Sequence, residues 1–244
     1  MIFVYYYAVL AATPAPIIQS ISGLGGTWSE IGHVASPNNT RTTSLWVGSG
    51  CSGTGQITVV TDQSGVNSNQ GYVIFEWPGS GGVLGTPSLL GHGSISVTGT
   101  TVALPSVSPS YPAGVDTTTP AIASNTKSSS FNSTSGTVTP NALAKSGNAY
   151  IVGNSHGTAE NVSPTNGSAV ELVDDNATDN RGMEVNYLVG YTSGNMGTSW
   201  TTSGQGSLQG AEINAVAGAV PTLDRKLFKP IPFTGRGKRL NSPI

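Results

Sequence analysis

Residues 1–12 read MIFVYYYAVLAA, an apolar stretch at the start of the sequence. It is rich in Tyr and Val, residues that favour β-strands. A secretory signal would have a Lys or Arg before its apolar run, and none is present here. The run is also too short to span a bilayer, which takes about 20 apolar residues. We therefore predict that residues 2–11 form the first strand of a buried core.

Short apolar runs with strand-like alternation recur along the rest of the chain, and turn residues such as Ser36-Pro37-Asn38-Asn39 separate them. No segment longer than about ten residues keeps an apolar stripe at the helical period, so we predict no substantial helix. This pattern is typical of a sandwich or barrel. The predicted fold class is all-β, an antiparallel β-sandwich of jelly-roll type. Its further strands are expected at 27–34, 42–48, 56–61, 71–77, 94–102, 149–152, 169–173, 183–189, 199–202 and 209–215.

Two segments interrupt the regular pattern. A Ser/Thr/Pro-rich excursion occupies about residues 105–146, and we expect a single strand in it, near 137–144. The chain from residue 217 onward has prolines at 221, 230, 232 and 243, which block a helix and a central strand alike. We predict one β-sandwich domain over residues 1–216 and an extended basic C-terminal arm over 217–244.

The arm combines cations with isolated hydrophobic residues, and it cannot form a core of its own. We expect it to lie along a neighbouring subunit or another partner, although a disordered basic tail is the alternative. Lys and Arg can also bind nucleic acid, because they release counterions from its phosphates. The basic patch at the end of the arm is short, however, and docking on an acidic protein surface explains it equally well. We therefore do not expect nucleic acid as the partner. The predicted partner-binding residues are Arg225, Lys226, Leu227, Phe228, Lys229, Ile231, Phe233, Arg236, Lys238 and Arg239.

Few residues are available for catalysis, since only 9% of the chain is charged and only three residues are His. Enzymes gather titratable groups in a cleft. Four Glu residues fall on predicted strands, and we interpret them as outward-facing: Glu76, Glu171, Glu184 and Glu212. His33, His92 and His156 lie far apart and are interpreted as exposed or satisfied loop residues. The chain is predicted not to be an enzyme and to need no cofactor.

The sequence contains one candidate site for a metal ion. Asp174, Asp175 and Asp179 form the main acidic cluster, and closely spaced oxygens can enclose Ca²⁺. A polar turn is the favoured interpretation, because Asp and Asn are common in turns. Cys51 is the single cysteine, so it excludes an intrachain disulfide and a Cys-based zinc site, and we interpret it as a small loop residue.

The four tryptophans, at 28, 46, 77 and 200, are embedded in strand patterns. Core packing therefore explains them better than a platform on which sugars stack.

Two stretches together resemble a β-sandwich module of phage head and tail decoration proteins and minor structural proteins. The first is ISGLGGTWSEIGHVASPNNTRTTSLWVGSGCSGTGQITVV (21–60) followed by GYVIFEW (71–77), and the second runs from AYIVGNSH to GAEINAV (149–216). In the closing half the matching positions are Glu184 with Tyr187, Trp200, and Ala211-Glu212-Ile213. The module has a further strand before the first one here, so the resemblance implies an exposed sheet edge near Met1 that would pair with another chain.

The resemblance implies a viral structural role and supplies no catalytic residues. We expect a non-enzymatic phage virion protein at the particle surface, namely a capsid decoration or cement protein anchored by its arm to a capsid or tail protein and to copies of itself, with no membrane partner. One alternative is a carbohydrate-binding or host-attachment module of a tail or fibre that binds a surface glycan. The other is a subunit of a self-assembling surface filament.

Overall fold

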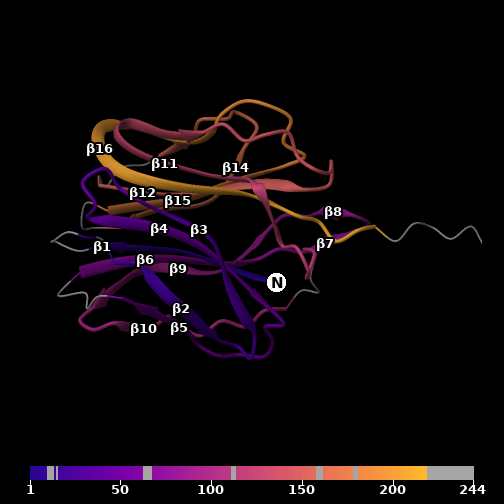
Figure 1. Cartoon of the computed structure of the whole chain (residues 1–244), viewed down its shortest axis with the longest axis horizontal. Coiled ribbons are helices and arrows are strands. Elements are labelled where there is room, and N and C mark those ends of the chain that lie inside the picture. The colour runs from indigo at the N-terminus through magenta and orange to yellow at the C-terminus, as the bar shows by residue number, and fades with distance from the viewer. Residues whose placement is uncertain are drawn as a thin grey trace, which may run out of the picture.

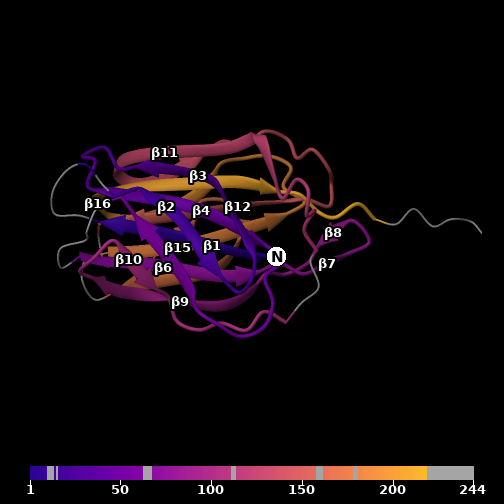
Figure 2. The same ribbon diagram turned by 60° about the horizontal axis from the view of Figure 1, so that its bottom comes forward.

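The computed structural model describes residues 1–9, 14, 16–62, 68–110, 114–157, 162–177 and 181–218. Three antiparallel sheets stack in layers (Figures 1 and 2). The central sheet has the order β3-β4-β1-β6-β9, the upper sheet β11-β16-β12-β15-β14, and the lower sheet β10-β5-β2. The described residues contain no helix, so the prediction of an antiparallel all-β chain is confirmed. The jelly-roll connectivity stays a prediction.

The strand bounds are as follows. The central sheet comprises β1 (Ile2–Val9), β3 (Thr27–Ala35), β4 (Arg41–Ser49), β6 (Ser68–Glu76) and β9 (Ser88–Val97). The lower sheet comprises β2 (Ile18–Gly23), β5 (Ile57–Thr61) and β10 (Thr101–Ala103). The upper sheet comprises β11 (Ala121–Val138), β12 (Ala149–His156), β14 (Val170–Ala177), β15 (Arg181–Val189) and β16 (Met196–Ile213), to which β13 (Ser163–Pro164) is added. A hairpin of β7 (Gly79–Ser80) and β8 (Val83–Leu84) forms a separate two-stranded sheet.

β1 lies in the middle of the central sheet and pairs with β4 on one side and β6 on the other. Successive side chains of a strand point to opposite faces, and both faces of this strand are covered. Phe3, Tyr5 and Tyr7 pack in the core shared with the upper sheet, whereas Val4 and Tyr6 pack in the core shared with the lower sheet. A continuous apolar run, without alternation, is what such a doubly covered strand requires.

Aromatic rings fill the core between the central and upper sheets. Phe3 stacks on Phe75 with ring centroids 5.2 Å apart, and Trp77 meets Tyr187 of β15 edge-on at 5.6 Å. Tyr5 lies over Gly153 of β12, where an added Cβ would come within 2.4 Å of the Tyr5 ring. The absence of a side chain at Gly153 therefore lets the two sheets approach around this ring.

A third core lies on the outer face of the upper sheet. The start of β16, around residues 196–200, bends back over this face and covers the core. The bend falls between Ser133 and Ser135 of β11, whose partners on β16 jump from Gly204 to Ser199. Such irregularities bend strands, and Figure 1 shows β16 curving sharply at this place. The bent-back start of β16 covers a cluster of buried apolar residues: Phe131, Val138, Tyr150, Val152, Val162, Tyr191, Met196, Trp200 and Leu208.

Two expectations from the sequence are wrong. The predicted exposed sheet edge near Met1 is not present, because β1 is paired on both sides. The segment expected to be largely an excursion contains β11, an 18-residue strand over Ala121–Val138, and residues 139–144 beyond it are not strand. Its Ser and Thr residues suit a half-exposed edge strand, which needs few apolar side chains. Residues 219–244 lie outside the described residues, so the predicted arm stays a prediction.

Candidate functional site

Three of the four glutamates that the sequence places on strands are buried, which corrects the prediction that they face outward. Glu76, Glu184 and Glu212 are at most 2% exposed, whereas Glu171 is exposed. The prediction failed because it assumed a two-layer fold with one solvated face on each strand. In this chain, both faces of the inner strands are covered. A buried carboxylate must find donors or a proton, so the surroundings of each one show what it does.

Glu76 and Glu212 are held by hydrogen-bond donors. The Ser110 backbone N–H and hydroxyl donate to the two oxygens of Glu76, at 2.9 and 3.0 Å. Glu212 accepts from the side-chain amides of Asn125 (2.8 Å) and Asn148 (2.5 Å) and from the backbone N–H of Ala144 (2.7 Å). Both carboxylates thereby fix loops to strands, which is a structural role.

Glu184 is different, because it has a single partner. The Asn186 amide donates to Glu184 Oε1 at 3.2 Å, and Oε2 is buried with no hydrogen-bond partner. Burial raises the pKa of Glu184 to about 8. The hydrogen bond from Asn186 opposes this rise, and the neighbouring carboxylates Glu171 and Asp174 add to it.

Polar side chains surround Glu184 under the bent-back start of β16. Asn154 of β12 is its register partner, and the Asn154 amide donates to Thr198 Oγ1 at 2.5 Å. The Asn186 amide donates to the Gly197 carbonyl at 3.2 Å. These bonds attach the bent-back segment to the sheet. The oxygens Asn154 Oδ1 and Asn186 Oδ1 are buried without a partner, like Glu184 Oε2.

The acidic cluster predicted from the sequence is divided by the structure. Asp174 and Asp175 are neighbours on β14 and therefore face opposite sides of the upper sheet. Asp174 Oδ2 accepts a hydrogen bond from the backbone N–H of Val162 at 3.3 Å. Asp175 Oδ2 lies 3.3 Å from Nδ1 of His92 on β9. Asp179 lies outside the described residues. Asp174 and Asp175 are thus not gathered at one site, and within the described part of the chain no three His, Cys, Asp or Glu side chains are placed to share a metal.

The histidines lie on strands, which corrects their placement in loops. His33 Nδ1 lies 2.7 Å from Glu30 Oε1, and His92 pairs with Asp175. Both pairs are near the surface. His156 is buried on β12 and stacks nearly parallel on Trp200, with centroids 5.0 Å apart. None of these contacts brings two histidines together.

The tryptophans pack in the core, as predicted. Trp46, Trp77 and Trp200 are at most 7% exposed. Trp28 is partly buried, and its indole N–H donates to the Gly23 carbonyl at 3.2 Å. Cys51 is half-buried in a loop, and burial raises the pKa of its thiol, which disfavours the nucleophilic thiolate.

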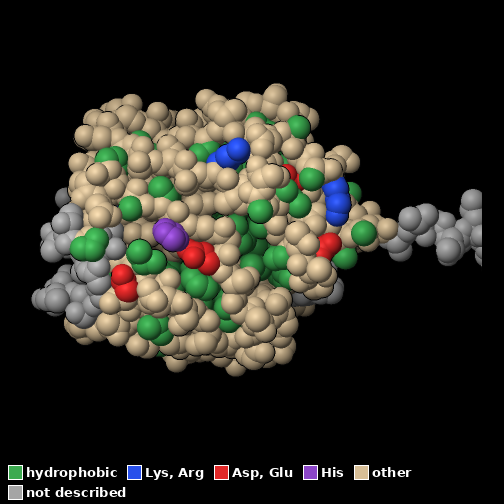
Figure 3. Space-filling view, viewed as in Figure 1, with side chains coloured by type: hydrophobic (Ala, Val, Ile, Leu, Met, Phe, Trp, Pro, Cys, Tyr) green, Lys and Arg blue, Asp and Glu red, His purple; other side chains and the backbone are tan. Residues whose placement is uncertain are grey.

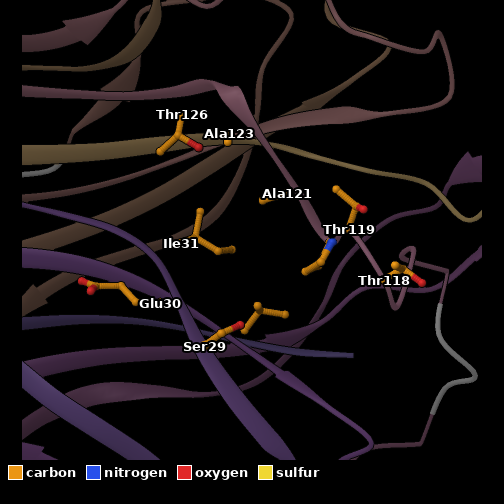
Figure 4. A pocket seen from close by; sticks show the side chains of 10 residues that line it. Ser29, Glu30, Ile31, Thr118, Thr119, Ala121, Ala123 and Thr126 are labelled. Carbon is orange, nitrogen blue, oxygen red and sulfur yellow. The ribbon is translucent and has the colours of Figure 1, made fainter.

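A groove of about 270 Å³ opens between β3 and the segment that leads into β11 (Figure 4). Its sides are short hydroxyl and aliphatic side chains, such as Ser29 and Ile31 on β3 and Thr119 and Ala121 opposite. Glu30 is the one carboxylate among its lining residues, and it is engaged with His33. No aromatic side chain lines the groove, so it lacks a surface on which a sugar ring could stack.

The surface in the view of Figure 3 is mostly uncharged, with scattered single charges. The predicted partner-binding residues Arg225 to Arg239 lie outside the described residues. In the described ranges, no helix is long and apolar enough to cross a membrane. Comparisons with protein-family models, with curated proteins and with solved structures found no match. The resemblance to a phage structural module stays a prediction.

Proposed function

We propose that the chain is a non-enzymatic structural protein of a phage virion, most specifically a capsid decoration protein: a layered β-sandwich body of jelly-roll type anchored to the particle by its basic C-terminal arm. The body would face outward, and the arm would lie on a capsid or tail protein or on a neighbouring copy. The proposal rests on the sequence resemblance and on the distribution of charge.

The charge distribution carries the argument. Residues 1–218 hold four Lys or Arg and eleven Asp or Glu, a net charge of −7, whereas residues 219–244 hold six and one, a net charge of +5. An acidic body followed by a basic segment suits attachment of the segment to an acidic protein surface. Repeated copies on a symmetric shell would add up modest contacts through avidity.

The body itself supports a structural role. Glu76 and Glu212 are buried and accept hydrogen bonds from groups that hold loops in place, and Glu184 is fully buried. The groove beside β3 presents one carboxylate, already paired with a histidine. The three buried glutamates are therefore not accessible to a substrate, as a catalytic acid or base has to be.

Neither alternative gains an observation in its favour. The carbohydrate-binding alternative needs an exposed aromatic platform, and three of the four tryptophans are buried. The filament alternative rested on an open edge at the first strand, and that strand is paired on both sides.

The test is co-sedimentation with particles from the source culture that have been stripped of the protein. We expect the full chain to bind and a chain of residues 1–218 to lose binding, because the arm supplies the anchor. A full-length variant with Gln in place of the six Lys and Arg of 219–244 separates charge from apolar contact. It should bind more weakly and with less salt dependence, because exposed charges are screened by salt. Equal binding by the truncated and full chains, with identical unfolding curves, would refute the anchor.

A further inference from the structure

The groove beside β3 opens onto the core between the central and upper sheets. Val47, one of its lining residues, is 2% exposed and belongs to that core. Ile31 of β3 and Ala121 on the opposite side also line the groove (Figure 4), and both pack against the same core while staying partly exposed. The groove therefore brings part of an apolar core to the surface, and an apolar side chain inserted there would extend this core.

Irregular pairing in both flanking strands accompanies the groove. Among the described strands, β3 and β11 are each the terminal strand of their sheet. The register of β3 against β4 shifts between Glu30 and Gly32, so Ile31 is the extra residue. The register of β11 against β16 shifts between Ile122 and Lys127. Such irregularities bend strands and are common at sheet edges and next to functional sites. Both fall at the groove, where the two sheet edges do not pair with each other.

The size and lining of the groove define what it can bind. A cavity of about 150 Å³ holds a benzene molecule, so the 270 Å³ of the groove leave room for one or two large apolar side chains. Hydroxyl groups can donate hydrogen bonds, so they suit the carbonyl groups of an extended peptide whose prolines have no N–H of their own. The groove is lined by four such hydroxyl side chains: Ser29, Thr118, Thr119 and Thr126.

We propose that the groove binds residues 227–233 from the arm of a second copy of this chain. That segment reads LFKPIPF and thus combines four large apolar residues and two prolines with one lysine. Charge is complementary as well, since the arm is basic, the body is acidic and Glu30 lines the groove. The inference rests on the proposed function, because it takes the arm as an anchor and assigns it a site on the neighbouring copy.

The course of the chain favours a second copy over the chain's own groove. The Asn214 amide donates to the carbonyl of Thr119, a lining residue, at 3.0 Å. The described chain then runs to Gly218, beside Gly82 in the turn of the β7–β8 hairpin, which lies at one end of the body (Figure 1). An arm that filled its own groove would have to turn back from there. Extended proline-rich chain spans about 3.1 Å per residue, so residues 219–233 would cover about 45 Å, roughly the width of a body of this length.

This contact joins two different surfaces, the arm of one copy and the groove of the next. Such head-to-tail contacts close into rings or extend into open chains. Every copy would then use its arm once and its groove once. Copies on a particle surface would be held to each other as well as to the shell.

The experiment is sedimentation velocity of the full chain and of two complementary variants. The wild-type chain should form species larger than a dimer as its concentration rises. The groove variant carries Ser29→Trp and Ala123→Trp, two exposed lining positions, and should stay monomeric because the indole rings fill the groove. The arm variant should stay monomeric too, and it has four apolar residues replaced: Leu227→Ser, Phe228→Ser, Ile231→Ser and Phe233→Ser. An equimolar mixture of the two variants should give a heterodimer and nothing larger, because only one arm and one groove remain between them.

Ser96→Trp is the matched control for the groove variant. Ser96 is also an exposed serine, but it lies on β9 at the opposite edge of the central sheet, so this variant should associate like the wild type. Identical urea unfolding curves would show that the variants are folded, and the arm variant leaves the body unaltered. Self-association of the groove variant would overturn the proposal. So would a wild-type chain that stays monomeric, and if the groove variant then exposed the arm to trypsin, the arm would occupy its own groove.

The outcome is distinguishable from failure of the proposed function. A wild-type chain that stays monomeric yet binds stripped particles through its arm would refute only the groove. A chain that associates through the groove yet binds no particle would refute only the proposed function.

Discussion

Replacing two adjacent tyrosines by alanine tests whether β1 is covered on both faces. Tyr5 and Tyr6 are both 0% exposed, but Tyr5 packs against the upper sheet and Tyr6 against the lower one. Tyr5 also donates a hydrogen bond to the Gln209 carbonyl at 2.9 Å, and Tyr6 donates to Gln70 Oε1. Removing a large buried aromatic ring costs about 3 to 5 kcal/mol. Each of Tyr5→Ala and Tyr6→Ala should therefore lower the free energy of unfolding by at least about 3 kcal/mol.

Equilibrium unfolding in urea measures the free energy of unfolding of both variants. Equal slopes of this free energy against urea concentration would confirm that the variants expose the same surface on unfolding. The corresponding Tm should fall by about 10 °C for each. Tyr5→Phe and Tyr6→Phe serve as matched controls that remove only a hydroxyl, with an expected cost of about 1 kcal/mol. In a two-layer sandwich one of two successive residues would face solvent and cost less than about 0.5 kcal/mol. Such a small value at either position would refute the three-layer arrangement.

Three further predictions concern single positions. Gly153→Ala should destabilise the chain by about 1 to 3 kcal/mol in urea unfolding, because its Cβ would lie 2.4 Å from the Tyr5 ring, whereas Gly99→Ala, with nothing within 4 Å, should cost under about 0.5 kcal/mol. The pKa of Glu184 is higher in the folded chain than in the unfolded chain, so the stability contributed by its neutral form is fully present below about pH 4.5 and is lost as pH rises through about 8. The difference in the free energy of unfolding between wild type and Glu184→Gln should follow this course. A difference that stays constant from pH 5 to 9 would contradict it. Cys51 should react with a thiol reagent more slowly in the folded chain than in urea, because burial raises the pKa of its thiol; equal rates would show an open, reactive thiol.

The sequence predicts the strands better than the way they are layered. Runs such as residues 2–9 and 71–76 are apolar enough to be recognised as strands, and the structure places both in the central sheet. A lack of alternation is typical of a strand that is buried on both faces, but it does not show that separate cores lie on its two sides. β11 was missed because its Ser and Thr residues resemble a loop, and its strand form depends on pairing with β16, which is distant in sequence.

The buried polar group under the bend could not be predicted for a related reason. Asn154, Glu184 and Thr198 come from three separate stretches, and register alone brings them together. The signal that was present is an acidic or amide residue within an apolar run, as in Gly182–Val189. A strand that carries Glu and Asn on one face and Val and Tyr on the other reads as half-exposed. Only the bend in β16 turns that face into an interior.

We propose that this β-layered body is a surface protein of a virus particle, anchored by its basic end. Electron microscopy of the native particle, at a resolution that traces the chain from Val216 to Ile244, tests it most directly. We predict that the three-sheet body repeats at fixed positions on the outside of the shell and that residues 219–244 run across a neighbouring subunit. Particles without this body on their surface, or with its arm free while the body contacts a host glycan, would rule out anchoring by the arm.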